Sequence, residues 1–334
     1  MLVRLLVLLF LIFNRGITAP VAGTTRIYLT PAAATAAPGQ KFTIDLMVDA
    51  GSQPVAAVDA FLDFNPTYLQ VLEIVPDVTA LPMLLISAYD NAAGEITYSA
   101  GKDPGGADAI GTFRLATILL RAVGTTTGTQ LAFVFQPPLR NTDIFYQGLS
   151  VFGSATNGNV TIPPLQIPLQ AGWNLISMPI VPAAPSLPGL LGSIAPYYTS
   201  VSAYNCNDQA DPWKQYTGAG SDLTTLTEKQ GVWIQMSSAA TLSITGTIPF
   251  STSIPLCQGW NLVGYPAHDE RNLTMALASI AGKYGRVMTF DAAAGKWQSY
   301  DASRPPYANT LTTLRPGRGY WIWMNQAAVL TIDY

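Results

Sequence analysis

Residues 41–48 read Lys-Phe-Thr-Ile-Asp-Leu-Met-Val, and this stretch sets the pattern of the N-terminal half. Every second residue in it is apolar: Phe42, Ile44, Leu46 and Val48. Successive side chains of a β-strand point to opposite faces of the sheet, so an alternation of this kind is typical of a strand that buries one face. The stretch therefore predicts a half-buried β-strand.

Similar apolar runs recur from Thr25 to Ile162 and are separated by clusters of Gly, Pro, Asn and Asp. Such clusters mark turns between strands. The clearest runs are Ala60 to Phe64, Ile96 to Tyr98, Phe113 to Leu120 and Leu131 to Phe135. Eight or nine short antiparallel strands predict a β-sandwich of the jelly-roll type over residues 24–165.

The second half, residues 166–334, follows the join Pro163-Pro164 and contains one unit twice, at 167–246 and 254–334. Ile167-Pro-Leu-Gln-Ala-Gly-Trp-Asn-Leu-Ile returns as Ile254-Pro-Leu-Cys-Gln-Gly-Trp-Asn-Leu-Val. Each copy predicts a strand, a short helix (187–194 or 273–280) and further strands. We therefore expect an all-β chain whose second half is a mainly-β tandem-repeat domain, with the two copies packed as a pseudo-symmetric pair.

Two cysteines, Cys206 and Cys257, fall in different copies. The equivalent positions in the other copies hold Ala292 and Gln170, so each cysteine is a change specific to its copy. This placement favours a disulfide between the copies, and two free buried thiols remain the alternative.

The N-terminus has the features of an export signal. Arg4 precedes an apolar run from Leu5 to Phe13, which is short for a membrane span. We expect residues 1–23 to be a signal peptide and the protein to be secreted or displayed at the cell surface, touching the membrane only through this segment. A retained anchor is the alternative.

Charge and motifs exclude several function classes. Charged residues make up 11% of the chain and the net charge is −3, which disfavours nucleic-acid binding. The single histidine is His268, and the sequence contains no motif of a catalytic nucleophile that this histidine could activate. We expect His268 in a solvated loop. The segment Asn205 to Asp208 with Asp211 is interpreted as a polar turn rather than a Ca²⁺ site. We expect no enzyme activity, no metal and no cofactor.

All seven tryptophans lie after residue 165. Four of them occupy repeated motifs and are expected to fill the two equivalent cores: Trp173, Trp233, Trp260 and Trp321. The other three, Trp213, Trp297 and Trp323, are the surface candidates. Aromatic rings stack on the apolar faces of sugars, so these three form a candidate carbohydrate-binding platform.

The first half also contains Val58-Asp-Ala-Phe-Leu-Asp-Phe-Asn-Pro-Thr-Tyr-Leu-Gln-Val, followed by Gly111-Thr-Phe-Arg-Leu-Ala-Thr-Ile and Gly158-Asn-Val-Thr-Ile. From Ile27 to Ile162 it resembles the cohesin family, β-sandwich modules that bind dockerins, and related carbohydrate-binding modules. Where cohesins usually have Tyr-Asp-Pro this chain has Phe-Asn-Pro. The resemblance implies a partner lying across an exposed sheet face to which Asp59 contributes. Alternation places Phe61 and Asp63 on that face too, and Ala60, Leu62 and Phe64 inside.

The repeated half resembles the Gly-Trp-Asn-Leu repeats of exported bacterial surface proteins, which implies location rather than activity. The leading hypothesis is a non-catalytic extracellular scaffold protein that binds a dockerin-like protein through its first half. One alternative is a polysaccharide-binding protein. The other is a structural subunit of a surface layer or filament, built by self-association.

Overall fold

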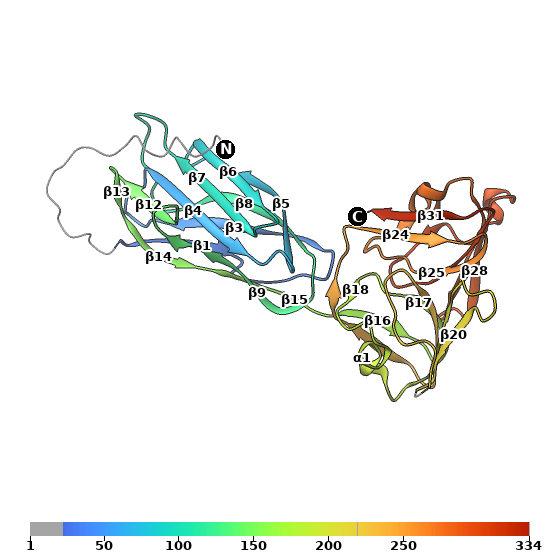
Figure 1. The fold of residues 1–334 in the computed structure, drawn as a ribbon. Helices are drawn as coiled ribbons and strands as arrows, with labels where there is room; N and C mark the ends of the chain where they lie inside the picture. The colour runs from blue at the N-terminus through green and yellow to red at the C-terminus, as the bar shows by residue number, and fades with distance from the viewer. Residues whose placement is uncertain (1–22, 219, 334) are drawn as a thin grey trace.

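The computed structural model describes residues 23–218 and 220–333 (Figure 1). Strands dominate both halves, which confirms the all-β class. Figure 1 shows a sandwich at one end and the repeat pair at the other. Residues 1–22 of the predicted signal peptide lie outside the described residues. Among the helices of the described part, none has both the length and the apolar character needed to cross a bilayer.

Two sheets form the N-terminal sandwich. The first has the order β14 (Phe152–Thr156), β1 (Thr25–Thr30), β3 (Lys41–Asp49), β8 (Thr112–Ala122) and β5 (Leu69–Pro76). The second has the order β13 (Leu149–Ser150), β12 (Asp143–Tyr146), β4 (Ala57–Phe64), β9 (Thr126–Phe133), β15 (Gly158–Ile162) and β2 (Ala33–Thr35). β4 also pairs with β7 (Glu95–Gly101), which carries β6 (Met83–Asp90) at the edge, and a small hairpin joins β10 (Phe135–Gln136) and β11 (Arg140–Asn141).

The sandwich departs from the prediction in two respects. It has more strands than the eight or nine predicted, and two of its pairings are parallel, β1 with β14 and β2 with β15. The parallel pairs arise because the first segments of the sandwich run beside its last segments. The two ends of this half of the chain therefore close both sheets.

Alternating side chains build the sandwich core as predicted. In β3 the inward residues Ile44, Leu46 and Val48 are buried, whereas Phe42, nearer the strand's start, is half-buried. In β4 the inward residues Ala60, Leu62 and Phe64 are buried and their neighbours are not. Burial of apolar area stabilises by roughly 25 cal/mol per Å², so these positions fix the register of both sheets.

The two copies of the repeat have the same strand order in their central sheets. The first has a sheet of β17 (Gly172–Ser177), β21 (Gly231–Met236), β19 (Tyr198–Tyr204) and β20 (Trp213–Tyr216), with the pairs β16 (Leu165–Leu169) and β22 (Ala240–Ile244), and β18 (Val181–Pro182) and β23 (Gly246–Thr247). The second has a sheet of β25 (Gly259–Val263), β30 (Tyr320–Met324), β27 (Tyr284–Asp291) and β28 (Lys296–Asp301), with the pairs β24 (Ser251–Leu256) and β31 (Ala328–Asp333), and β26 (Arg271–Asn272) and β29 (Thr313–Leu314). Each copy has its own hydrophobic core.

Short helical turns occur where the repeat predicts them. α1 (Leu187–Leu190) continues into the 3-10 turn η1 (Gly192–Ile194), and α2 (Leu273–Ala276) continues into η2 (Ala278–Ile280). A further 3-10 turn, η3 (Pro306–Ala308), belongs to the second copy alone among the described elements. Leu187 and Leu273 point into the two cores at equivalent places.

The asparagine of the repeated Trp-Asn-Leu motif has the same structural role in both copies. The Nδ2 of Asn174 donates to the carbonyl oxygens of Gln170 (2.7 Å) and Gly172 (3.1 Å). Asn261 makes the same two bonds to Cys257 (2.8 Å) and Gly259 (3.0 Å). Both side chains are buried, and a buried amide is costly unless it is hydrogen-bonded. The asparagine therefore holds the turn that enters each central sheet.

The two copies meet along a seam made by equivalent strands. Ile176 bridges to Arg318, and the equivalent Val263 bridges to Gln230. Two glycines allow this approach: a Cβ on Gly231 would lie 2.6 Å from the carbonyl oxygen of Val263, and one on Gly319 would lie 2.7 Å from that of Ile176. Equivalent contacts in both directions show that the copies are related by a pseudo-twofold axis.

The sandwich and the repeats also touch each other. The Ile248 amide donates to the carbonyl of Val123 (2.7 Å), and the Thr125 amide donates to that of Gly246 (2.9 Å). Nearby, His268 packs so closely against Gly39 that a Cβ there would lie 2.6 Å from its ring. The expectation of a solvated loop was wrong: His268 is half-buried, and this burial lowers its pKa.

Candidate functional site

One candidate surface is the solvent side of β6, β7, β4 and β12, which we call the outer face. Cross-strand register sorts its side chains into rows. One row has Ile86, Ser99, Asp59 and Asp143; the next has Ala88, Thr97 and Phe61; the third has Asp90, Glu95 and Asp63. The outer face thus brings together the three residues predicted from the sequence, Asp59, Phe61 and Asp63.

Asp59 lies in the middle of the first row. Its Oδ1 accepts a hydrogen bond from the hydroxyl of Ser99, and the carboxylate of Asp143 lies on the opposite strand. Partial burial raises the pKa of Asp59; the Ser99 hydrogen bond lowers it, and the charge of Asp143 raises it further. A half-buried carboxylate of this kind can accept a further donor from a partner.

Asp63 is already engaged within the chain. The Nη1 of Arg140 contacts the Oδ1 of Asp63 at 2.6 Å and the Oε1 of Glu95 at 3.2 Å, while its Nη2 donates to the carbonyl of Leu62 (3.1 Å). Within these rows five carboxylates face one guanidinium. The outer face is therefore net acidic, and in its middle row the apolar residues Phe61 and Ala88 flank Thr97.

Strand β6 forms the free edge of the outer face, and the sequence analysis did not predict it. Its exposed apolar residues are Leu84, Leu85, Ile86 and Tyr89, and Leu85 is 56% exposed. β6 pairs with β7 along its length. The signal for this strand was the apolar run Met83-Leu-Leu-Ile, which lacks the alternation that marks a half-buried strand.

A second candidate surface carries the tryptophans of the repeats. The prediction that Trp173, Trp233, Trp260 and Trp321 fill the cores was wrong. Trp173 is 45% exposed and the other three are half-buried. Each of the two strands β21 and β30 turns aliphatic residues such as Ile234 inward, so its tryptophan lies on the opposite side of the sheet.

The predicted surface tryptophans lie on the same side. Trp213, Trp297 and Trp323 are 40%, 48% and 41% exposed. We call the surface formed by all seven tryptophans with Tyr204 and Phe290 the aromatic face. Trp323 stacks edge-on against Trp260 (5.3 Å between ring centroids) and lies apart from the other two.

Each copy lends aromatic rings to the other across the seam. Trp233 of the first copy contacts Phe290 and Trp297 of the second, both at 5.7 Å between ring centroids. In the equivalent arrangement Trp321 contacts Tyr204 at 5.2 Å and Trp213 at 5.7 Å. Aromatic rings of the hairpins β19–β20 and β27–β28 thus pack against the other copy, and the aromatic face exists only in the pair.

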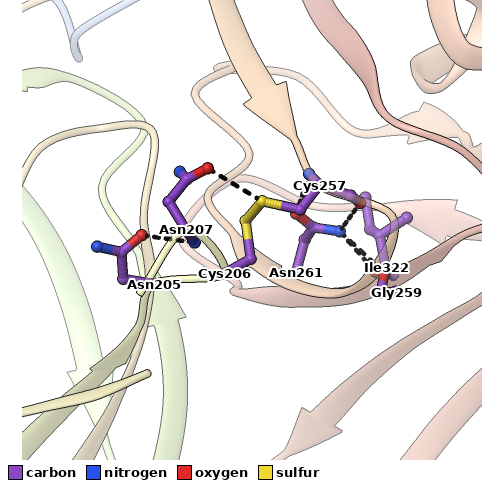
Figure 2. Close-up of a disulfide and its surroundings, with 7 residues drawn as sticks. All are labelled: Asn205, Cys206, Asn207, Cys257, Gly259, Asn261 and Ile322. Atoms are coloured by element: carbon purple, nitrogen blue, oxygen red, sulfur yellow. Dashed lines mark hydrogen bonds between the residues drawn. A yellow bond between two sulfur atoms is a disulfide. The ribbon is translucent and has the colours of Figure 1, made fainter. Parts of the chain in front are cut away.

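The structure joins Cys206 and Cys257 by a disulfide with a Cα–Cα distance of 6.1 Å (Figure 2). Cys206 follows β19 of the first copy, and Cys257 precedes β25 of the second. Asn261 fixes the second cysteine: its Oδ1 accepts from the Cys257 amide (2.8 Å), as Figure 2 shows. The bridge therefore links the copies beside the seam.

The polar segment from Asn205 to Asp211 is a turn cross-linked by a lysine. The Nζ of Lys214 contacts the carboxylates of Asp208 (2.9 Å) and Asp211 (3.1 Å). The hydrogen bonds from Lys214 lower the pKa of Asp208. Across residues 23–218 and 220–333, no cluster of three or more His, Cys, Asp or Glu side chains is arranged to hold a metal ion.

Comparison with known proteins gives matches at the level of structure alone. No family model and no curated protein sequence matches the chain. A type I cohesin–dockerin complex from Clostridium thermocellum is similar at 13% identity and TM-score 0.36, covering 45% of this chain and 98% of that one. A non-cellulosomal cohesin from Archaeoglobus fulgidus is similar at 15% identity and TM-score 0.33, covering 41% and 90%. A ScaC cohesin in complex with a ScaB dockerin, from Acetivibrio cellulolyticus, is similar at 14% identity and TM-score 0.34, covering 41% of this chain and 98% of that one.

Proposed function

We propose that the chain is an exported, non-catalytic binding protein whose sandwich captures a partner protein on the outer face. The observation that carries this proposal is the edge strand β6, where four large apolar side chains are 42–56% exposed at the border of an acidic sheet face. Soluble proteins usually protect such edges, because free backbone groups and exposed apolar residues promote association. Ile86 lies on the outer face itself, whereas Leu84 and Tyr89 pair with the buried Ala100 and Ile96 and lie on the other side of the strand.

The chemistry of the outer face indicates what the partner must offer. Carboxylates at Asp59, Asp90 and Glu95 call for a segment rich in hydrogen-bond donors or positive charge. Ile86 and Phe61 call for apolar side chains between those donors. We name a dockerin-like module as the first partner to test, because the cohesin resemblance of residues 58–71 implies one.

Export is supported by two features. The N-terminal segment has the composition of a signal peptide, and disulfides persist mainly in oxidising compartments such as the cell exterior. The Cys206–Cys257 bridge fits that setting.

The test is calorimetric titration of the full chain with a panel of recombinant dockerin modules. We expect at least one to bind, and we expect Ile86→Glu and Asp59→Arg each to weaken that binding tenfold or more. Phe250→Glu, at an exposed apolar residue between the two repeats, and Asp49→Arg, on the other sheet of the sandwich, are matched controls that should change affinity less than twofold.

Two outcomes would contradict the proposal. One is a panel in which no dockerin binds. The other is binding that the outer-face variants leave intact. Concentration-dependent sedimentation of the chain alone, abolished by Ile86→Glu, would instead assign the edge to self-association and favour the structural-subunit alternative.

A further inference from the structure

A groove opens on the aromatic face at the junction of the two copies, with a volume of about 590 Å³. Its floor is made by Ser202 and Trp233, which are cross-strand neighbours on β19 and β21. Trp173 and Trp213 of the first copy form part of its walls, and Phe290 and Trp297 of the second copy complete them. We call this space the aromatic groove.

The lining of the groove restricts the chemistry of its occupant. None of its lining residues carries an ionisable side chain, so a charged ligand would leave water without a compensating partner. Ring faces from five aromatic residues offer flat apolar contact. The hydroxyl of Ser202 and the amide of Gln215 add hydrogen-bonding groups beside these rings. The volume falls in the range of about 300–1,000 Å³ that is typical of ligand sites.

From these observations we infer that the aromatic groove binds a neutral polysaccharide chain, stacking sugar rings on its tryptophans. A pyranose presents an apolar face and a rim of hydroxyls, and this matches rings flanked by uncharged polar groups. The site differs from the platform expected from the sequence: Trp213 and Trp297 belong to it, whereas Trp323 lies outside it in another hollow. This inference is independent of the proposed partner binding by the sandwich.

The second copy supplies an internal comparison. The pseudo-symmetric counterpart of the groove is lined by Trp260, Met288, Trp297 and Trp321 and has a volume of about 210 Å³. Met288 stands where the first copy has Ser202, opposite Trp321 as Ser202 is opposite Trp233. A long thioether side chain thus occupies in one copy the space that a small serine leaves open in the other. We infer one saccharide site per chain.

The same comparison provides the decisive variant, Ser202→Met, which fills the groove without removing a ring. The fold accepts methionine at this position, because the equivalent strand holds Met288. Binding is measured by calorimetry on the full chain with the hexasaccharides of cellulose, xylan, mannan and chitin as probes. Oligogalacturonate serves as the charged comparison, and a proline-rich peptide tests the other kind of ligand that docks on aromatic grooves.

We expect at least one neutral hexasaccharide to bind with a stoichiometry of one, and Ser202→Met and Trp297→Ala each to weaken it tenfold or more. Trp323→Ala, at a tryptophan of similar exposure outside the groove, should change affinity less than twofold. Near-UV circular dichroism verifies folding of each variant. The inference is overturned if no neutral saccharide binds, if only oligogalacturonate or the peptide binds, or if Ser202→Met binds like the unaltered chain.

Discussion

The sandwich and the repeat pair use the two faces of their sheets differently. In the sandwich, apolar residues fill one core between two sheets, and the outer face carries carboxylates around a short apolar row. In the repeats, one side of each four-stranded sheet carries aliphatic residues that pack in the core of that copy. The other side carries tryptophans that lie on a face shared with the other copy. In both regions, therefore, the alternating aliphatic residues of a strand identify the side that faces the core. In the repeats, the tryptophans identify the side that faces the surface shared by the two copies.

The sharpest test of this difference uses the neighbours Ile322 and Trp323, which lie on opposite sides of β30. Ile322 is fully buried, so Ile322→Ala should lower the free energy of unfolding by about 2–5 kcal/mol. Trp323 is 41% exposed and stacks on Trp260, so Trp323→Ala should cost only about 1 kcal/mol. Urea denaturation followed by tryptophan fluorescence measures both. Equal losses would show that the outward tryptophans are structural core after all.

Removal of the disulfide is a second way to test the difference between the two regions. Replacing Cys206 and Cys257 by serine removes a 51-residue cross-link and should lower the stability of the repeats by about 2–4 kcal/mol. The sandwich contains neither cysteine and should be unaffected. All seven tryptophans lie in the repeats, so their fluorescence follows the repeats, while far-UV circular dichroism follows both regions. A single transition that shifts as a whole would mean that the two regions unfold together.

Acid should weaken the second copy through Asp301. Hydrogen bonds from the side chain and amide of Ser303, and the Arg286 guanidinium 2.9 Å away, lower the pKa of Asp301 to about 2. The folded state therefore favours the ionised form, and its contribution is present above pH 4 and is lost as the pH falls toward 2. Asp301→Asn should flatten the decline of the melting temperature over this window. An unchanged pH profile would show that Asp301 does not contribute to the loss of stability in acid.

The smallest expected effect concerns Asp59 in the sandwich, whose contribution to stability depends on pH in the opposite direction to that of Asp301. Because burial raises the pKa of Asp59, the folded state favours its protonated form, so this contribution is present at low pH and is lost as the pH rises through that pKa. Asp59→Asn keeps an acceptor for Ser99 and removes the charge. We expect a slightly higher melting temperature than the unaltered chain at pH 7 and no difference at pH 3. A lower melting temperature at pH 7 would contradict this sign.

Local patterns in the sequence were enough for the parts of the fold that depend on local periodicity. The strands around Ile44 and Leu62, the helical turns at Leu187 and Leu273, and the outward placement of Asp59 all follow from alternation or from the repeat. β6 was missed because an edge strand with both sides exposed has no alternation to read. The predicted core placement of the repeated tryptophans was wrong because a repeated residue can also line a surface that the two copies share.

The aromatic groove could not be predicted from either copy alone. Its walls come from both copies, and the contact of Trp233 with Trp297 joins residues that no local pattern relates. The repeat did contain one usable signal, the substitution of Ser202 by Met288 at equivalent positions. Its meaning depends on knowing that both side chains face the aromatic surface.

The single disulfide makes the pseudo-symmetric repeat pair covalently asymmetric. On the Cys206 side the two copies are tied covalently beside a cleft of about 350 Å³, whereas the equivalent cleft of about 300 Å³ on the other side, with Gln170 and Ala292, has no covalent link. Reduction of the bridge would remove this asymmetry and leave the two copies joined by the equivalent contacts of the seam.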